Sequence, residues 1–174
     1  ILKEFKNEIF LINSKKDLQS SEIFKKKIIL CLHDKMIKKT SYTLNFKENL
    51  DLLSNSCFNL SCPGVVMPLC HHLIEGIKVG SIPITNCEKL LFPYLTEEIS
   101  LQYSSMNQLI EKFHEALVMK NDDVLYMREK VLNYYKTNLS PENFKKNFIK
   151  ILSKNEKKII CCDDHRSVEK FQNI

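Results

Sequence analysis

The stretch from His71 to Thr85, HHLIEGIKVGSIPIT, decides the fold. An apolar helical segment that carries one acidic side chain, Glu75, runs into a glycine, and the β-prone run 81–84 follows directly. Upstream, another β-prone run, 57–60, ends in a turn-forming loop. The order strand, loop, helix, glycine, strand predicts a βαβ unit with parallel strands. Its helix start presents unpaired N–H groups and a positive dipole end, which favours an anion such as a phosphate.

The rest of the chain continues this alternation of strands and helices. We expect an α/β fold, a Rossmann-like parallel sheet flanked by helices, with a mostly helical C-terminal third. Apolar runs and helical spacing predict strands over 27–32 and 99–103, and helices over 1–12, 43–55, 105–119, 121–135 and 141–152. For the last three helices we expect starts at Ser104 or Ser105, at Asn121–Asp123, and at Ser140-Pro141.

Residues 75–84, EGIKVGSIPI, resemble the E-A-x-x-x-G-x-x-P-[VI] signature of glycosyltransferases with the two-domain GT-B fold. The PGVVMPLCHH run at 63–72 and the segment 139–142 are similar to the exostosin-like and surface-polysaccharide members of this group. The resemblance is strongest over residues 55–150. It implies a donor-binding half that transfers a sugar from a nucleoside-diphosphate sugar to an acceptor hydroxyl. It also implies a metal-independent reaction with no cofactor beyond the donor substrate.

This resemblance shapes the expected domain organisation. A chain of 174 residues suits one domain with a substantial core, whereas a GT-B enzyme needs two. We therefore expect residues 1–24 to be a helical segment or a remnant of a preceding domain or linker. Residues 25–155 should form the Rossmann-like nucleotide-sugar-binding domain, and 156–174 a C-terminal tail. The N-terminal acceptor domain would then be missing, and the chain, which begins with Ile1, would be a fragment.

Glu75 is the strongest candidate for a binding residue. The resemblance implies that its carboxylate accepts hydrogen bonds from the ribose hydroxyls of the donor. A carboxylate suits this task because it only accepts and can bind two hydroxyls together. The alternative is an acidic residue on a solvated helix face. Many retaining GT-B enzymes carry a second Glu eight positions earlier, where this chain has Met67, so no nucleophile or general base is assigned.

Two further groups of residues are expected near the donor. Backbone and side chains around the helix start should meet the diphosphate, and at most one of the two adjacent histidines can point toward it. This first group consists of Gly64, Pro68, Cys70, His71 and His72. The second group, His33 and Lys35, follows the strand over 27–32 at the sheet edge where ligands bind in open α/β sheets. A lysine there would neutralise the departing diphosphate.

The net charge and the cysteines indicate which partners and which cellular compartment to expect. The net charge of +5 is spread over solvated lysine clusters without interleaved aromatic residues, so nucleic acid is not an expected partner. Expected partners are a nucleotide sugar and a glycan or lipid-linked acceptor, the latter bringing the protein to a membrane surface. Seven cysteines at irregular spacing favour a reducing, cytoplasmic location over a disulfide framework.

Three other interpretations remain open from the sequence. A non-catalytic interaction domain could retain the half-fold without the chemistry. A different nucleotide enzyme, such as one using NAD, is disfavoured because the three glycines cannot form G-x-G-x-x-G. A zinc module would use Cys62, Cys70, His71 and His72, or Cys161, Cys162 and His165, although neither spacing is typical of zinc sites.

Overall fold

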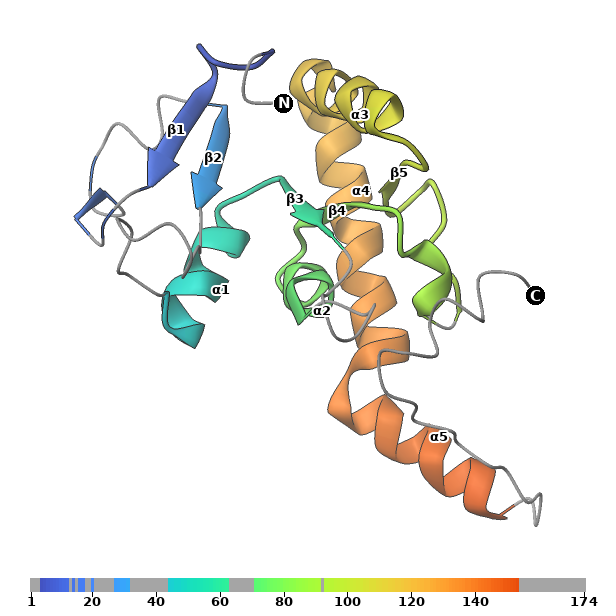
Figure 1. Cartoon of the computed structure of the whole chain (residues 1–174). Coiled ribbons are helices and arrows are strands. Elements are labelled where there is room, and N and C mark those ends of the chain that lie inside the picture. Colours follow the sequence, from blue (N-terminus) through green and yellow to red (C-terminus); the bar gives the residue numbers. More distant parts are fainter. Residues whose placement is uncertain are drawn as a thin grey trace, which may run out of the picture. The chain divides into compact units, whose positions relative to one another are not determined.

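The computed structural model describes residues 4–12, 14, 16, 17, 20, 27–31, 44–62, 71–91 and 93–153. It divides the chain into two compact units, 1–51 and 52–174 (Figure 1). This division falls inside the range 25–155 predicted as one domain. The predicted limits at 24/25 and 155/156 stay predictions, and the tail from 156 onward lies outside the described residues.

The first unit contains two short parallel strands, β1 (Ile9–Ile12) and β2 (Ile28–Cys31), in register Ile9 to Ile28. Both strands are runs of apolar residues, and most of their side chains are half-buried, while Ile12 is buried and Leu11 is exposed. Helix α1 (Phe46–Ser54) starts in this unit with a reciprocal cap. Asn45 Oδ1 accepts from Glu48 N at 2.9 Å, and Glu48 Oε2 accepts from Asn45 N at 2.8 Å.

The helix predicted over 1–12 is wrong for its described residues. Residues 4–8 form turns, and Ile9–Ile12 is the strand β1. The apolar residues at helical spacing include a continuous apolar run of four, Ile9–Ile12. A continuous apolar run of this length is as compatible with a strand as with a helix. Pairing with β2 then decides the conformation, because β preference depends on the neighbouring strand more than on the local sequence.

The second unit is built on a parallel sheet with strand order β3-β4-β5, which confirms the expected α/β class. Its strands are β3 (Phe58–Ser61), β4 (Ile82–Thr85) and β5 (Leu101–Gln102), the last shorter than predicted. Helix α2 (His71–Lys78) lies between β3 and β4 in the chain and completes the predicted βαβ unit. Gly80 adopts φ 77°, a conformation that favours glycine, and it turns the chain from α2 into β4.

Four helical segments follow the sheet and confirm the helical C-terminal third. They are α3 (Met106–Val118), α4 (Asn121–Tyr134), the π-helical η4 (Tyr135–Leu139) and α5 (Pro141–Ser153). A short 3₁₀ turn, η3 (Glu88–Leu90), precedes β5. Ser105 caps α3 as predicted, accepting from Gln108 N, and Pro141 begins α5. Helix α4 starts at Asn121 as predicted, although Lys120 rather than one of residues 121–123 occupies the cap position. The carboxylates of Asp122 and Asp123 lie in the first turn, where they interact favourably with the positive end of the helix dipole.

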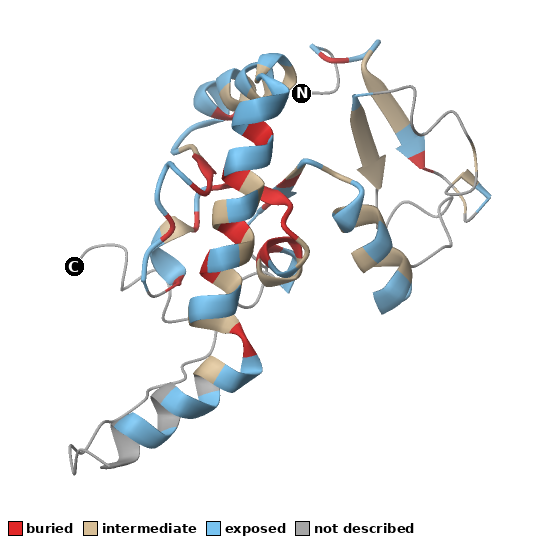
Figure 2. Cartoon of the chain, turned by 180° about the vertical axis from the view of Figure 1, so that it is seen from behind, coloured by how far each residue is buried: buried red, intermediate tan, exposed pale blue. Residues whose placement is uncertain are grey.

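The core of the second unit joins α2, α4 and the sheet (Figure 2). Helix α4 buries the face that carries Val124, Met127 and Val131. The hydroxyl of Tyr134, also buried, donates to the carbonyl of Pro93 at 2.5 Å. Strand β4 is buried along its whole length, as expected for the central strand of a covered parallel sheet. The sheet and helix α2 therefore pack against a buried core that α4 completes.

Candidate functional site

Helix α2 begins at the carboxyl edge of the parallel sheet. Strand β3 ends at Ser61, α2 starts at His71, and the chain returns to the amino end of β4 after Gly80. The helix therefore runs antiparallel to the strands, with its positive end at the edge where open α/β sheets bind ligands. This is the position that the sequence predicts for an anion site.

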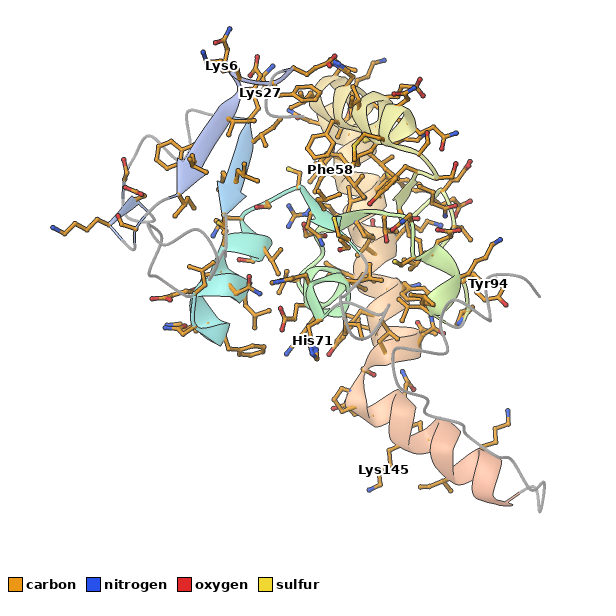
Figure 3. The ribbon with its side chains drawn as sticks, viewed as in Figure 1. Lys6, Lys27, Phe58, His71, Tyr94 and Lys145 are labelled. Atoms are coloured by element: carbon orange, nitrogen blue, oxygen red, sulfur yellow. The ribbon has the colours of Figure 1, made fainter. Side chains whose placement is uncertain are left out.

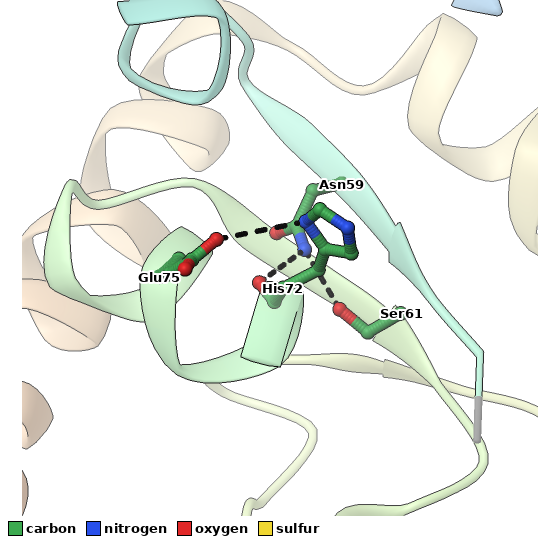
Figure 4. A network of polar contacts seen from close by, with 4 residues as sticks. All are labelled: Asn59, Ser61, His72 and Glu75. Atoms are coloured by element: carbon green, nitrogen blue, oxygen red, sulfur yellow. Dashed lines mark hydrogen bonds and ion pairs between the residues drawn. The ribbon is translucent and has the colours of Figure 1, made fainter. Parts of the chain in front are cut away.

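Asn59 on β3 anchors the first turn of α2 (Figure 4). The side chain is buried, and its Nδ2 donates to Ser61 Oγ at 2.7 Å and to the carbonyl of His72 at 3.3 Å. Within the described part of the chain, Asn59 Oδ1 has no hydrogen-bond partner. The sheet thus holds the helix start through one buried amide.

Gly76 allows α2 to lie this close to β3. A Cβ added to Gly76 would stand 2.5 Å from Asn59 Oδ1 and 2.8 Å from Nδ2, well inside contact distance. Leu73 and Ile77 flank this contact and are fully buried. The requirement at Gly76 is therefore steric, and it fixes the height of α2 above the sheet.

Glu75 and His72 form a pair on the outer side of the first turn. His72 Nδ1 lies 3.6 Å from Glu75 Oε2, and the two side chains are 50% and 21% exposed. His71, next to them at the helix start, is exposed (Figure 3). A carboxylate with partial access to solvent, one turn inside a helix start, can accept hydrogen bonds from a ligand that also contacts the helix end.

The structure brings together three of the eight predicted site residues: Glu75, His71 and His72. The other five lie outside the described residues. They are Gly64, Pro68 and Cys70 in the connection between β3 and α2, and His33 and Lys35 after β2. Their predicted roles stay predictions.

Sequence reasoning missed a row of side chains at the carboxyl edge. In register, Ser61 pairs with Thr85 and Thr85 with Gln102, so the next residues, Cys62, Asn86 and Tyr103, end three adjacent strands. Tyr103 N donates to the Thr85 carbonyl at 3.1 Å, which continues the ladder to this level. Only the strand order places these three residues together, so no local motif could have identified them.

Polar contacts stabilise this edge. Thr85 Oγ1 donates to the Ser61 carbonyl at 3.2 Å and accepts from Cys87 N at 3.0 Å, while the Cys87 thiol donates to Asn86 Oδ1 at 3.4 Å. Burial, followed by the neighbouring Cys62 and Cys87, raises the pKa of Tyr103 to about 12. A phenol is protonated at neutral pH even at its usual pKa of 10.0, and this shift holds the proton more tightly, so Tyr103 can donate a hydrogen bond.

Two other kinds of site bear on the function, one for a metal ion and one for a membrane. The described residues contain no group of three or more His, Cys, Asp or Glu side chains placed to hold a metal ion. Cys70, Cys161, Cys162 and His165 of the zinc hypothesis lie outside those residues. In the same described ranges, no helix combines the length and the apolar character needed to cross a membrane.

Comparison with known proteins adds no family assignment: no family model, curated protein or solved structure matches this chain. The case for a function therefore rests on the residues and their geometry.

Proposed function

We propose that this chain is the donor-binding half of a GT-B-type glycosyltransferase, which transfers a sugar from a nucleoside-diphosphate sugar to an acceptor hydroxyl. The observation that carries the proposal is the place of Glu75. Its carboxylate is partly exposed, one turn inside a helix that begins at the carboxyl edge of a parallel sheet. The resemblance of residues 75–84 to the GT-B signature assigns the ribose to that carboxylate.

The start of α2 suits the donor diphosphate. The first N–H groups of an α-helix have no partner within it, and the helix dipole adds partial positive charge there. His71 and His72 place imidazole groups at the same end, and His72 also lies beside Glu75. The proposed arrangement binds the diphosphate at the helix start and the ribose one turn further along.

The chemistry then consists of stabilising the leaving group. As the bond between the sugar carbon and the diphosphate oxygen breaks, negative charge develops on the diphosphate, which the helix start and one adjacent imidazole stabilise electrostatically. The acceptor oxygen forms the new bond to the sugar carbon and loses its proton to a general base. We place that base and the acceptor site in a partner domain that closes over the bound donor. The proposal uses no metal ion, and places the protein in the cytoplasm, with a glycan or lipid-linked acceptor at a membrane surface.

A second candidate function is a non-catalytic interaction domain with the same half-fold. One observation favours it: Met67 stands where retaining relatives carry a Glu. This alternative predicts a folded protein that binds no nucleotide.

Thermal denaturation with UDP, GDP, ADP or CMP tests the proposal. A ligand at a hundredfold its dissociation constant adds roughly 2.7 kcal/mol of stability. For a domain of this size, the midpoint rises by about 5–10 °C. We expect one nucleoside diphosphate to produce this rise, Glu75→Gln to abolish it, and Glu111→Gln, at an exposed position on α3, to leave it intact. A folded sample that responds to none of the four would reject the donor site and favour the interaction domain.

A further inference from the structure

His72 is attached to the sheet through its backbone and to Glu75 through its side chain (Figure 4). Its carbonyl accepts from Nδ2 of the buried Asn59 at 3.3 Å, and the same nitrogen donates to Ser61 Oγ at 2.7 Å. Its imidazole Nδ1 lies 3.6 Å from Glu75 Oε2. A residue whose backbone is held by a buried amide thus presents its ring to the carboxylate that the proposed function assigns to the ribose.

The geometry of α2 brings these two side chains together. Residues three apart are neighbours on a helix surface, and their side chains lean toward the helix N-terminus. The Glu75 side chain therefore lies over the turn that carries His72. The buried residues Leu73 and Ile77 occupy the core-facing side of the same helix, so the pair stands on its outer side.

The contact with His72 limits the freedom of the carboxylate. A glutamate on a solvated helix face samples several rotamers, whereas the Glu75 side chain is only 21% exposed and has an imidazole beside it. The imidazole attracts the carboxylate as a cation, or in the neutral tautomer that carries its proton on Nδ1. Holding a binding group in one geometry lowers the ordering cost of binding a ligand. The arrangement therefore suits a carboxylate that accepts from hydroxyl groups in fixed positions.

We propose that His72 is a positioning residue, which holds the Glu75 carboxylate in the orientation that binds the ribose hydroxyls of the donor; this inference rests on the proposed function. His72 acts through Glu75 and contacts no part of the ligand. The diphosphate then meets the helix amides and His71, which stands about 100° around the helix from His72. The two histidines therefore have different roles: His72 serves the carboxylate and His71 the leaving group.

Isothermal titration calorimetry on the full chain tests this role with the ribose hydroxyls as the variable. The ligands are UDP, GDP, ADP and CMP, each compared with its 2′,3′-dideoxy counterpart, which lacks both hydroxyls. We expect His72→Phe to weaken the ribonucleotide about two- to fivefold, as for a partly exposed ion pair, and to leave the dideoxynucleotide unchanged. His72→Gln should keep most of the wild-type affinity, because its amide N–H can still donate to the carboxylate.

A double-mutant comparison separates positioning from direct contact with the ligand. In a protein that already carries Glu75→Gln, His72→Phe should have no further effect, because the carboxylate that it positions is gone. The control is His114→Phe, at an exposed position on α3, which should change neither affinity. Circular dichroism checks that each variant folds.

Three results would overturn the positioning role and leave the donor site standing. They are equal weakening of ribonucleotide and dideoxynucleotide by His72→Phe, an effect of His72→Phe that persists beside Glu75→Gln, and no weakening of either ligand. A wild-type protein that binds ribonucleotide and dideoxynucleotide equally, or binds neither, would overturn the assignment of the ribose to Glu75 and this inference with it.

Discussion

Gly76→Ala tests the close approach of α2 to β3. The new Cβ would stand 2.5, 2.7 and 2.8 Å from Oδ1, Cγ and Nδ2 of Asn59. The Asn59 side chain cannot simply rotate away, because it is buried and holds Ser61 Oγ and the His72 carbonyl. Helix α2 cannot lift without exposing Leu73 and Ile77. Either response therefore lowers the free energy of unfolding.

The magnitude follows from three contributions. Overpacking a filled site costs about 1–3 kcal/mol. Displacing a hydrogen-bonded amide costs about 1 kcal/mol more. Alanine offsets about 1 kcal/mol, because it is a better helix former than glycine. We expect Gly76→Ala to lower the free energy of unfolding by about 1–3 kcal/mol, measured by urea denaturation with an unchanged m-value.

The control is to make Gly76→Ala in a protein that already carries Asn59→Ala. With the amide removed, the methyl group introduced by Gly76→Ala enters the vacated space, so the same substitution should be neutral or stabilising there. The double-mutant cycle should show a favourable coupling of about 2 kcal/mol. A Gly76→Ala protein as stable as wild type, or an equal loss in both backgrounds, would refute the steric argument.

Three further predictions concern other contacts. Because the pKa of Tyr103 is raised from 10.0 to about 12, the folded state holds the phenolic proton more tightly than the unfolded state. Its contribution to stability is full below pH 10 and is lost as the pH rises toward 12, so wild type should lose more stability than Tyr103→Phe over this range in urea titrations; parallel curves would contradict this. Arg128 donates to the carbonyls of Ser54, the last residue of α1, at 3.1 Å and of Ser56 at 3.3 Å. Arg128→Ala should lower the free energy of unfolding by about 1 kcal/mol in urea denaturation, and Arg128→Lys should restore only part of this because an ammonium lacks the planar fork. Full restoration by Lys would show that charge alone matters. Gly80→Ala forces a Cβ onto φ 77° and to within 2.9 Å of Leu132 Cγ, so the thermal midpoint should fall by several degrees, about 1–3 kcal/mol, and an unchanged midpoint would argue against this turn.

Local patterns were sufficient for most of the second unit. The βαβ order, the glycine turn at 80, the cap at Ser105 and the helix start at Pro141 each depend on residues within a few positions of one another. Such signals act through backbone conformation and short-range hydrogen bonds, which the sequence specifies directly. The place of Glu75, one turn inside α2, follows from the same local pattern.

The sequence by itself thus determined the α/β class, the course of the chain through the βαβ unit and the position of Glu75 on its helix. Only tertiary structure decided that Ile9–Ile12 is a strand, because its partner lies at Ile28–Cys31 and the local pattern fits two conformations. Only tertiary structure set Asn59 under Gly76 and aligned Cys62, Asn86 and Tyr103 at one edge. These relations join residues 17 to 41 positions apart, and they depend on strand order and packing distance, which no local spacing encodes.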